Sequence, residues 1–385
     1  MPNFSGVWDL KDQVQAIAAG RWTGLPLPGL YAWGNNYHGA VGDGTTIRRS
    51  SPVQIGSLTT WSQVAGGGYH TAALKSDGTL WTWGRNNFGQ LGQNTTVSRS
   101  SPIQIGALTT WSKISGGRQH TAAIKTDGTL WTWGAGGSGR LGDGTNVDKS
   151  SPVQVGALAN WSQVSAGNYH NIALKTDGTL WAWGAGSSGR LGDGTVANKS
   201  SPVQLGALTT WAQVSAGEEQ SAAVKTDGTL WAWGNGYSGT LGNNNAGLGN
   251  LFSSPIQIGA LTNWSKVAMS SHAVSVKTDG TIWAWGRNAY GQIGDNTVTN
   301  RSSPVQIGSA TNWTTASVSK SQTASNFSAA ADSDGKLYLW GANSSGQLGD
   351  GTVVNRSSPV QVPSSPLSWL TFSAGGLHTV AVLES

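Results

Sequence analysis

The stretch from Gly66 to Gly84, GGGYHTAALKSDGTLWTWG, decides the fold because recognisable copies of it return along the whole chain. It predicts a β-hairpin. Residues 70–76 form one short strand, and residues 79–83 form a second strand rich in β-forming side chains. Between them, Asp77-Gly78 makes the turn, since glycine adopts a positive φ with little strain.

The second strand of this hairpin is bulky or neutral on both faces. Trp81 and Trp83 lie two residues apart and share one face, while Leu80 and Thr82 share the other. Because neither face carries charge, we expect the strand to lie in a sheet packed between two other sheets.

The hairpin belongs to a repeat that runs through the chain. The closing Trp-Gly pair occurs seven times, at intervals of 50 to 55 residues, with its tryptophan at Trp33, Trp83, Trp133, Trp183, Trp233, Trp285 and Trp340. A strand led by another tryptophan recurs as often, at Trp61, Trp111, Trp161, Trp211, Trp264, Trp313 and Trp369. The Asp-Gly turn between them occurs only six times, at Asp77, Asp127, Asp177, Asp227, Asp279 and Asp334.

The missing seventh turn predicts how the ends of the chain meet. The sequence stops at residues 380–385, just before a seventh turn would come, and the first Trp-Gly strand begins at Leu30 without a preceding partner. Pairing the first strand with the last closes a ring and removes exposed sheet edges. A period near 50 with about four short strands per unit is typical of a β-propeller. We therefore predict an all-β, seven-bladed propeller, with outer strands from segments such as 52–58 and 61–65.

The repeat resembles the regulator of chromosome condensation repeat family of seven-bladed propellers. The matching motif, Gly-x-x-His…Asp-Gly…Trp-Gly-x-Asn-x-x-Gly-Gln-Leu-Gly, is clearest between Gly67 and Gly92, and the resemblance covers residues 29–385. It implies the fold, whereas unrelated functions occur on propellers. The family's founding activity, nucleotide exchange on a small GTPase with chromatin binding, implies an acidic loop surface. Only Glu218 and Glu219 match that expectation.

Composition narrows the function classes. Charged residues make up 11% of the chain and the formal net charge is +5. No Lys/Arg run is longer than Arg48-Arg49, so dedicated nucleic-acid binding is disfavoured. There is no cysteine, and no apolar run approaches the roughly 18 residues of a membrane span. The N-terminus lacks the pattern of a secretory signal, so we expect synthesis in a cytoplasm.

Residues 1–28 lie outside the repeat and form a separate tail. Asp9 is expected to cap a short helix over residues 10–19, which needs a docking surface, either the propeller's own rim or a partner subunit. The opening Phe4-Ser-Gly-Val-Trp-Asp-Leu resembles the start of many tailed-phage virion proteins. This resemblance implies that the tail anchors the propeller to a particle. The expected anchoring residues are Phe4, Val7, Trp8, Leu10, Val14, Ile17 and Trp22.

A ring of basic residues is the main candidate ligand site. They stand three positions before the proline of the Ser-Ser-Pro segments, at Arg49, Arg99, Lys149, Lys199, Arg301 and Arg356. On one rim of the propeller they can attract acidic glycans, lipopolysaccharide phosphates or nucleic acid. The alternative, which we favour, is that each stem covers apolar surface or bonds a loop carbonyl.

Departures from the repeat mark further candidates for specificity. Glu218 and Glu219 replace the residues found before the repeat histidine, and Phe252 takes the place of a basic residue within the altered loop 243–252. Residues 317–328 lose the Gly-x-x-His pattern. For each of these, drift in a free loop is the simpler interpretation.

Histidines recur at one position of five units, at His70, His120, His170, His272 and His378. Such a ring suggests a metal site or a pH switch, but its repetition favours a structural hydrogen bond to the adjacent loop. No nucleophile, phosphate-binding or zinc motif is present, so we expect neither enzyme activity, cofactor nor metal. One known activity of this family, ultraviolet-B sensing, uses tryptophans after glycine in Gly-Trp-Arg-His-Thr motifs. The equivalent positions in this chain hold Tyr69, Gln119, Tyr169 and Leu377.

These observations favour a non-enzymatic propeller carried in a phage virion as a fibre, decoration or host-adsorption protein. Its partners would be other virion proteins, reached through the tail within an oligomeric assembly, and an anionic glycan or host-surface ligand at the rim. The alternatives are an intracellular protein-interaction module of the guanine-nucleotide exchange factor type and a free carbohydrate-binding propeller.

Overall fold

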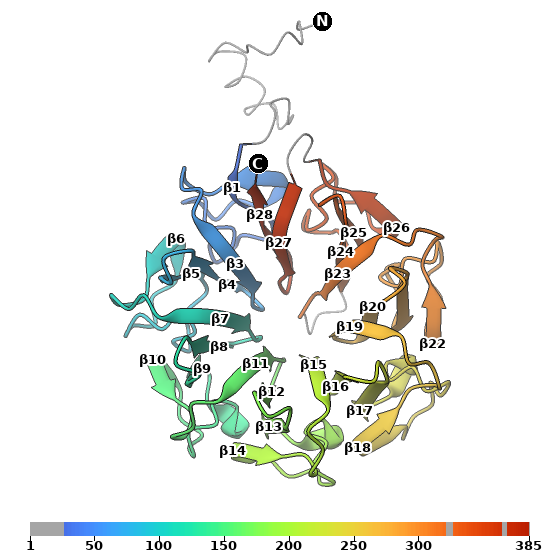
Figure 1. Ribbon diagram of the computed structural model, residues 1–385. Helices are drawn as coiled ribbons and strands as arrows, with labels where there is room; N and C mark the ends of the chain where they lie inside the picture. Colours follow the sequence, from blue (N-terminus) through green and yellow to red (C-terminus); the bar gives the residue numbers. More distant parts are fainter. Residues whose placement is uncertain (1–26, 321–325, 364–367, 385) are drawn as a thin grey trace, which may run out of the picture.

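The computed structural model describes residues 27–320, 326–363 and 368–384, and these form a ring of seven four-stranded antiparallel sheets around a central axis (Figure 1). Each sheet is one blade. We number the blades by their innermost strands, so that blade 1 contains β27, blade 2 contains β3 and blade 7 contains β23. The predicted propeller is therefore confirmed.

Each blade places its four strands at successive distances from the axis. The innermost strands are β3 (Trp61–Gly66), β7 (Trp111–Gly116), β11 (Trp161–Ala166), β15 (Trp211–Ala216), β19 (Trp264–Met269), β23 (Trp313–Val318) and β27 (Ser368–Ala374). The second strands are β4 (His70–Lys75), β8 (His120–Lys125), β12 (His170–Lys175), β16 (Gln220–Lys225), β20 (His272–Lys277), β24 (Phe327–Asp332) and β28 (His378–Glu384).

The outer half of each blade follows the same pattern. The third strands are β5 (Leu80–Gly84), β9 (Leu130–Gly134), β13 (Leu180–Gly184), β17 (Leu230–Asn235), β21 (Ile282–Gly286), β25 (Leu337–Gly341) and β1 (Gly29–Gly34). The outermost are β6 (Arg99–Gln104), β10 (Lys149–Gln154), β14 (Lys199–Gln204), β18 (Leu251–Gln257), β22 (Arg301–Gln306), β26 (Arg356–Gln361) and β2 (Arg49–Gln54). Three short 3₁₀ turns complete the described elements: η1 (Gly137–Gly139), η2 (Ser187–Gly189) and η3 (Tyr237–Gly239).

The two ends of the chain meet in blade 1, whose strand order is β2-β1-β28-β27. β1 and β28 pair antiparallel, from Gly29 opposite Leu383 to Gly34 opposite His378. The predicted pairing of the first strand with the last is thus present. It leaves neither of these two strands with a free edge.

The sequence-based prediction is wrong about the position of one strand and about the bounds of another, whose outer position is confirmed. It places segment 61–65 on the outside, but β3 is the innermost strand of its blade, and its small C-terminal residues meet the neighbouring inner strands near the axis. The outermost strand of blade 1 is β2, which starts at Arg49 and not at residue 52. Its Ser-Ser-Pro sequence looks like a turn, yet an edge strand tolerates proline because its missing N–H is not needed by a further strand.

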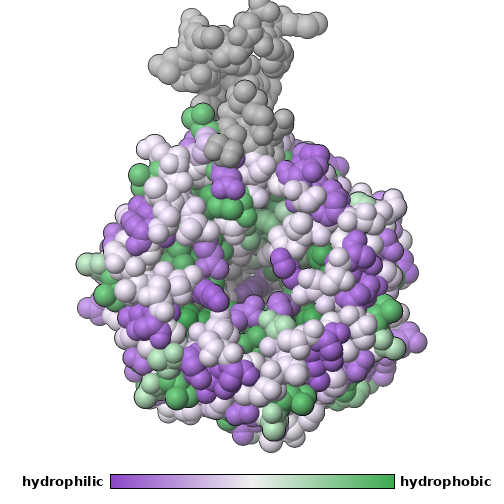
Figure 2. Space-filling model, in the orientation of Figure 1, coloured by the Kyte–Doolittle hydropathy of each residue, from purple (hydrophilic) through white to green (hydrophobic). Residues whose placement is uncertain are grey.

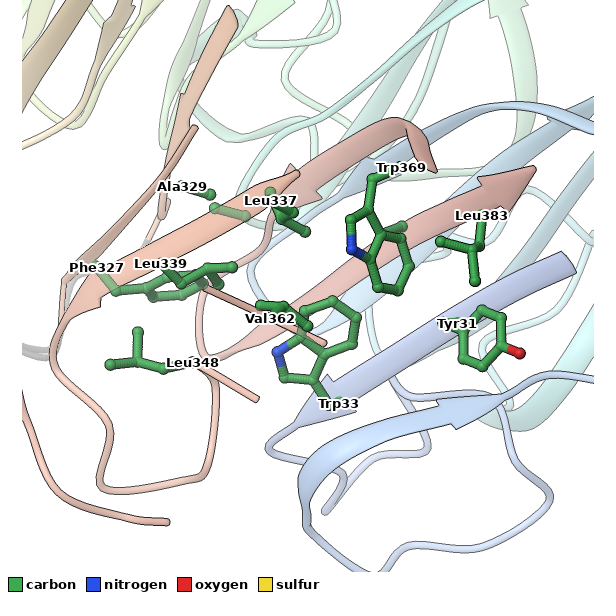
Figure 3. Packing of buried hydrophobic residues seen from close by; sticks show 12 residues of the cluster. Tyr31, Trp33, Phe327, Ala329, Leu337, Leu339, Leu348, Val362, Trp369 and Leu383 are labelled. Atoms are coloured by element: carbon green, nitrogen blue, oxygen red, sulfur yellow. The ribbon is translucent and has the colours of Figure 1, made fainter. Parts of the chain in front are cut away.

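Apolar side chains fill the wedges between blades. As predicted, the two faces of β5 pack in opposite directions. Trp83 packs with blade 1 residues such as Leu30, whereas Leu80 packs with Trp111 and Trp133 of blade 3. Figure 3 shows the wedge between blades 7 and 1, where Trp33 and Trp369 meet. The core is a set of interfaces between blades, so no blade has a closed core of its own.

Each Trp-Gly tryptophan also ties its blade to the preceding one. In blade 2, Trp83 Nε1 donates to Ala40 O in the β1–β2 loop at 2.9 Å. Equivalent bonds are donated by Trp133, Trp183, Trp233, Trp285, Trp340 and Trp33. The loop reaches the indole because Gly42 has φ +88°, and a Cβ there would lie 2.5 Å from Trp83 Nε1. The seven bonds form a circular set of links between blades.

The predicted N-terminal helix over residues 10–19 lies outside the described residues, as do the seven expected anchoring residues. Within the described part of the chain, secondary structure is β-strand apart from the three 3₁₀ turns. In that same part, we find no helix with the length and apolar character needed to span a membrane.

Candidate interaction surface

Two kinds of loop gather at one end of the propeller. His70 pairs with Gly84, and Gly84 with Arg99, so the β3–β4 and β5–β6 connections lie at the same edge of blade 2. The same register recurs in the other blades. We call this end the loop face, and the opposite end, which carries the Asp-Gly turns, the turn face. Every candidate residue of the rim lies on or near the loop face.

The basic ring is largely neutralised by the protein's own aspartates. Arg49 Nη2 lies 2.6 Å from Asp43 Oδ2, six residues earlier in the chain. The equivalent pairs are Lys149–Asp143, Lys199–Asp193, Arg301–Asp295 and Arg356–Asp350. The favoured interpretation was that each stem covers apolar surface or bonds a loop carbonyl, and it did not include an aspartate as the partner. The constant six-residue spacing of opposite charges was the signal that could have identified it.

These aspartates also organise their loops. Asp43 Oδ1 accepts from the Thr45 amide at 3.0 Å and from its hydroxyl at 2.8 Å. Burial alone would raise the pKa of Asp43, but hydrogen bonds from Thr45 and Arg49 outweigh it and hold the pKa below the usual value. The basic ring is therefore part of the loop structure, and five of its six members are not free cations.

Two positions of the ring depart from this pairing. In blade 2, Gln93 replaces the aspartate, so Arg99 has no such partner. In blade 5, Asn243 and Phe252 replace both members, and Phe252 packs against the apolar wedges on both sides of its blade. Phe252 is thus a packing residue in the structure, although the sequence suggested a ligand contact.

The histidine ring consists of hydrogen bonds between blades. His70 Nε2 lies 2.9 Å from Thr121 Oγ1 of blade 3, and Thr121 Oγ1 donates its hydrogen to Gln90 O. His70 must therefore donate from Nε2, and burial lowers its pKa to about 3, so its imidazole is neutral at pH 7. His120, His170, His272 and His378 make equivalent contacts with Asn171, Ser221, Ser328 and Thr71. The histidines thus make structural hydrogen bonds, but to strand residues of the next blade and not to the adjacent loop expected from the sequence. No cluster of metal-ligating side chains occurs among the described residues.

A second charged cluster, which we call the arginine cluster, surrounds Tyr169 on the loop face. The guanidinium carbons of Arg118, Arg140 and Arg190 lie 5.5, 5.0 and 5.9 Å from the centre of the Tyr169 ring. Arg118 also donates to the Tyr169 hydroxyl. The four side chains come from separate loop segments, and only the ring geometry brings them together.

Two of these arginines are buried. Arg140 is 7% exposed and Arg190 is 3% exposed. Arg190 donates to Ser187 O and to Glu218 O, whereas Nη1 of Arg140 has no hydrogen-bond partner among the described residues. Burial lowers the pKa of both guanidinium groups; Tyr169 opposes the shift at Arg140, and Glu219 opposes it most strongly at Arg190. Arg140 Nε donates to Gly137 O at 2.9 Å, so the guanidinium is held by its own turn and by the Tyr169 ring.

Glu218 and Glu219 border the arginine cluster. Glu219 pairs with Arg190 at 3.4 Å and accepts from Asn235 Nδ2 at 2.8 Å. Burial and the neighbouring Glu219 raise the pKa of the Glu218 carboxyl. The sequence prediction thus identified the acidic edge of this cluster but missed its arginines and Tyr169. A usable signal was present, since Arg140 and Arg190 occupy the position that is glutamine in Gly-Gln-Leu-Gly.

Lys320 occupies the axis of the ring. From the end of blade 7, its Nζ reaches Gly116 O at 2.8 Å and Ala166 O at 2.5 Å on blades 3 and 4. Burial lowers the pKa of Lys320 to about 8. Figure 2 shows a hollow at the centre of the ring. The hydrogen bonds of Lys320 thus join the inner end of blade 7 to β7 and β11 across the central region.

Taken together, the fold and this surface define a closed, seven-bladed propeller of repeats about 50 residues long, with charged clusters on its loops. The sequence profile of the RCC1-like domain matches residues 3–248. That of the regulator of chromosome condensation (RCC1) repeat matches residues 227–275, 279–330 and 334–382. The chain belongs to the RCC1-like domain family.

Relatives of known identity match only in part. The ultraviolet-B receptor UVR8 of Arabidopsis thaliana is 32% identical over 114 residues, which are 29% of this chain and 25% of the receptor. The X-linked retinitis pigmentosa GTPase regulator of Canis lupus familiaris is 33% identical over 100 residues, which are 26% of this chain and 10% of that protein. The matched segments therefore span a quarter or less of these relatives.

Solved structures match over nearly the whole chain and support the fold. Human WBSCR16 has a TM-score of 0.81 at 21% identity, covering 94% of this chain and 100% of that one. Prp20p from Saccharomyces cerevisiae has a TM-score of 0.82 at 19% identity, covering 100% and 97%. The Prp20p structure was described together with its binding to Gsp1p and histones.

Proposed function

We propose that this protein is a non-enzymatic protein-interaction module whose arginine cluster on the loop face binds a partner protein. The observation that carries the proposal is the convergence of Arg118, Arg140 and Arg190 on Tyr169, with a buried guanidinium nitrogen left without an acceptor among the described residues. Arginine and tyrosine are enriched among the residues that dominate protein–protein binding energies. The bordering Glu218 and Glu219 add specificity through charge.

The relatives support one type of partner. Prp20p, which shares this fold, binds Gsp1p and histones, and the retinitis pigmentosa relative is a GTPase regulator. A small GTPase is therefore the first partner to test, and exchange-factor activity is the most specific form of the proposal. The mixed charge of the cluster, with arginines beside two glutamates, suits a protein surface better than the uniformly anionic backbone of nucleic acid.

The test compares partner capture by the full chain and by matched variants. The double variant Tyr169→Ala and Arg118→Ala removes the centre of the cluster. Both side chains are half-buried, so their loss should leave the fold intact. Lys336→Ala, at an exposed site on the turn face, is the control. Proteins cross-linked to each variant in the native host are quantified, and release of fluorescent GDP from any captured GTPase is measured.

We expect one or more partners to be lost at least about tenfold with the double variant and kept with Lys336→Ala. Loss of a few desolvated contacts of 1–2 kcal/mol gives an effect of this size. Equal capture by all three chains would refute the loop-face proposal. Partner loss without any effect on GDP release would retain the interaction module and reject its exchange-factor form.

The virion and carbohydrate-binding alternatives have less support. The virion interpretation rests on residues 4–22, which lie outside the described residues, and none of the relatives named above is a virion protein. The glycan interpretation needed free cations on the rim, whereas most of that ring is paired with aspartates. We therefore place the interaction module ahead of both.

A further inference from the structure

Five blades contain the same built-in site for a carboxylate. In blade 1, Asp43 Oδ1 accepts from the Thr45 amide and hydroxyl, and Asp43 Oδ2 accepts from Arg49 Nε at 2.7 Å. The same role belongs to Asp143, Asp193, Asp295 and Asp350. The side chains of these aspartates are only 5–10% exposed. Each loop thus offers converging donors to one buried acid.

Blade 2 keeps the donors but lacks the acid. Gln93 stands at the aspartate position, and its Nε2 donates away from the site, to Thr82 Oγ1 at 3.1 Å and Thr82 O at 3.3 Å. Arg99 Nε and Gln93 Oε1 are both buried, and neither has a hydrogen-bond partner among the described residues. Blade 5 differs, because Asn243 and Phe252 remove the acid and the base together. A retained base without its acid therefore distinguishes blade 2.

A cavity of about 540 Å³ opens beside Arg99, between blades 2 and 3. Its polar lining includes Gln93, Arg99 and Lys125, and its apolar lining includes Leu108 and Trp131. Lys125 Nζ lies 3.8 Å from the centre of the Trp131 ring, so this second positive charge is held in place. The cavity is much larger than one carboxylate group. It therefore has room for an acidic side chain together with apolar neighbours.

We propose that Arg99 and the Thr95 loop bind the carboxylate of an aspartate or glutamate side chain from a partner protein, which enters the cavity between blades 2 and 3. The incoming group would take the place that Asp43 occupies in blade 1. A guanidinium offers a carboxylate two parallel donors, and such charge-assisted bonds are strong where water is excluded. The choice of a protein as the occupant rests on the proposed function above.

The carboxylate site is tested without a partner, in the full-length chain with ¹⁵N-labelled arginine. Sodium acetate replaces sodium chloride at constant ionic strength while the arginine Nε–H resonances are followed. We expect the Arg99 resonance, identified by its loss in Arg99→Gln, to shift and saturate. The resonances of Arg49, Arg301 and Arg356 should shift no more in acetate than they do in chloride, because each of these arginines is already paired with an aspartate.

Two substitutions at one position provide the matched comparison. Gln93→Asp supplies an internal acid, so it should abolish the acetate response and raise the melting temperature. Gln93→Ala also removes the glutamine but supplies no acid, so it should keep the response. If acetate moves Arg99 no more than Arg49, or moves it equally in Gln93→Asp, the carboxylate site does not exist.

The nature of the occupant is tested with a capped Leu-Glu-Leu peptide and its Leu-Gln-Leu counterpart. We expect the glutamate peptide to saturate the Arg99 resonance at a concentration at least about tenfold below that of acetate, and the glutamine peptide to have no effect. Equal affinity for acetate and the glutamate peptide would overturn the assignment to a protein side chain. These titrations do not involve Tyr169 or Arg118, so their outcome is independent of the capture experiment on the loop face.

Discussion

At the scale of single residues, the buried histidines couple the fold to pH. Burial lowers the pKa of His70, His120 and His272 to about 3 and that of His378 to about 4. The pKa of His170 is also well below 6.5. Each neutral imidazole contacts the next blade through Nε2, and its burial disfavours the protonated, charged form. The same histidines titrate normally in the unfolded chain.

This difference predicts a loss of stability between pH 6.5 and about pH 4. In that range the unfolded chain binds up to five protons that the folded chain does not bind, so stability falls as the pH falls and is fully present above pH 6.5. Each proton contributes about 1.4 kcal/mol per pH unit. Urea unfolding measured from pH 8 to pH 4 gives the free energy of unfolding at each pH. The slope of this free energy against pH gives the number of protons taken up on unfolding.

His38 provides the control, because it is only partly buried and is not part of the ring. Burial and the nearby Arg85 also lower the pKa of His38, but its imidazole is not fully buried, so His38→Asn should change the slope less than His120→Asn does. Aspartates such as Asp43, whose pKa is lowered, act in a separate window below about pH 3.8. A slope near zero between pH 6.5 and 4 would show that the histidines are not the titrating groups.

At the scale of elements, the two tryptophans of one strand have different roles. Trp83 is fully buried and donates to Ala40 O of the preceding blade, whereas Trp81 is half-buried and donates to Thr79 Oγ1 within its own turn. The first links two blades, and the second stabilises a local turn. The sequence placed both on one strand face but did not distinguish these roles.

Replacing each tryptophan by phenylalanine separates the two roles. Trp83→Phe loses the inter-blade hydrogen bond and leaves a small cavity, so it should destabilise the fold by about 2–4 kcal/mol. Trp81→Phe should cost less than about 1 kcal/mol, because its site is partly exposed. Urea unfolding of both variants is the measurement. Equal losses would contradict the assignment of Trp83 as the link between blades.

The repeat explains how much of the architecture could be predicted from sequence. The Asp77-Gly78 turn and the alternation around Trp83 predicted the hairpin. The count of six turns for seven Trp-Gly strands predicted the pairing of the two chain ends. The radial order was not predictable in the same way, because Trp61–Gly66 looks like any strand with mixed exposure. Its innermost position follows from contacts with neighbouring blades, which no local pattern encodes.

The candidate site was less predictable for a related reason. Arg118 and Tyr169 are 51 residues apart, so they become neighbours only when adjacent blades are placed side by side. Glu218 was singled out because it breaks the repeat. Arg140 and Arg190 do so less visibly, since both stand in otherwise regular Gly-x-Leu-Gly segments. A comparison of equivalent positions in successive blades would have predicted that these residues are neighbours.

At the scale of the whole molecule, ten of the 23 lysines and arginines are held by aspartates or by tryptophan rings. Five basic residues of the rim pair with aspartates. On the turn face, five lysines lie within 4 Å of a tryptophan ring centre, at Lys75, Lys125, Lys175, Lys225 and Lys277. These charges stabilise the propeller. Arg99 is paired with no aspartate among the described residues, and the arginine cluster gathers around Tyr169.

Ring closure makes the last strand essential to the whole propeller. β28 lies between β1 and β27, so a chain that ends at residue 377 would leave two open strand edges and expose the wedge that contains Trp33 and Trp369. We expect this truncation to aggregate or to unfold at a midpoint at least about 10 °C lower, because open edges pair with other chains. A chain starting at Leu27 keeps every strand of the ring and serves as the control. The measurements are thermal unfolding and light scattering of both chains. A truncated chain that stays monomeric and melts at an unchanged temperature would show that blade 1 does not need its closing strand.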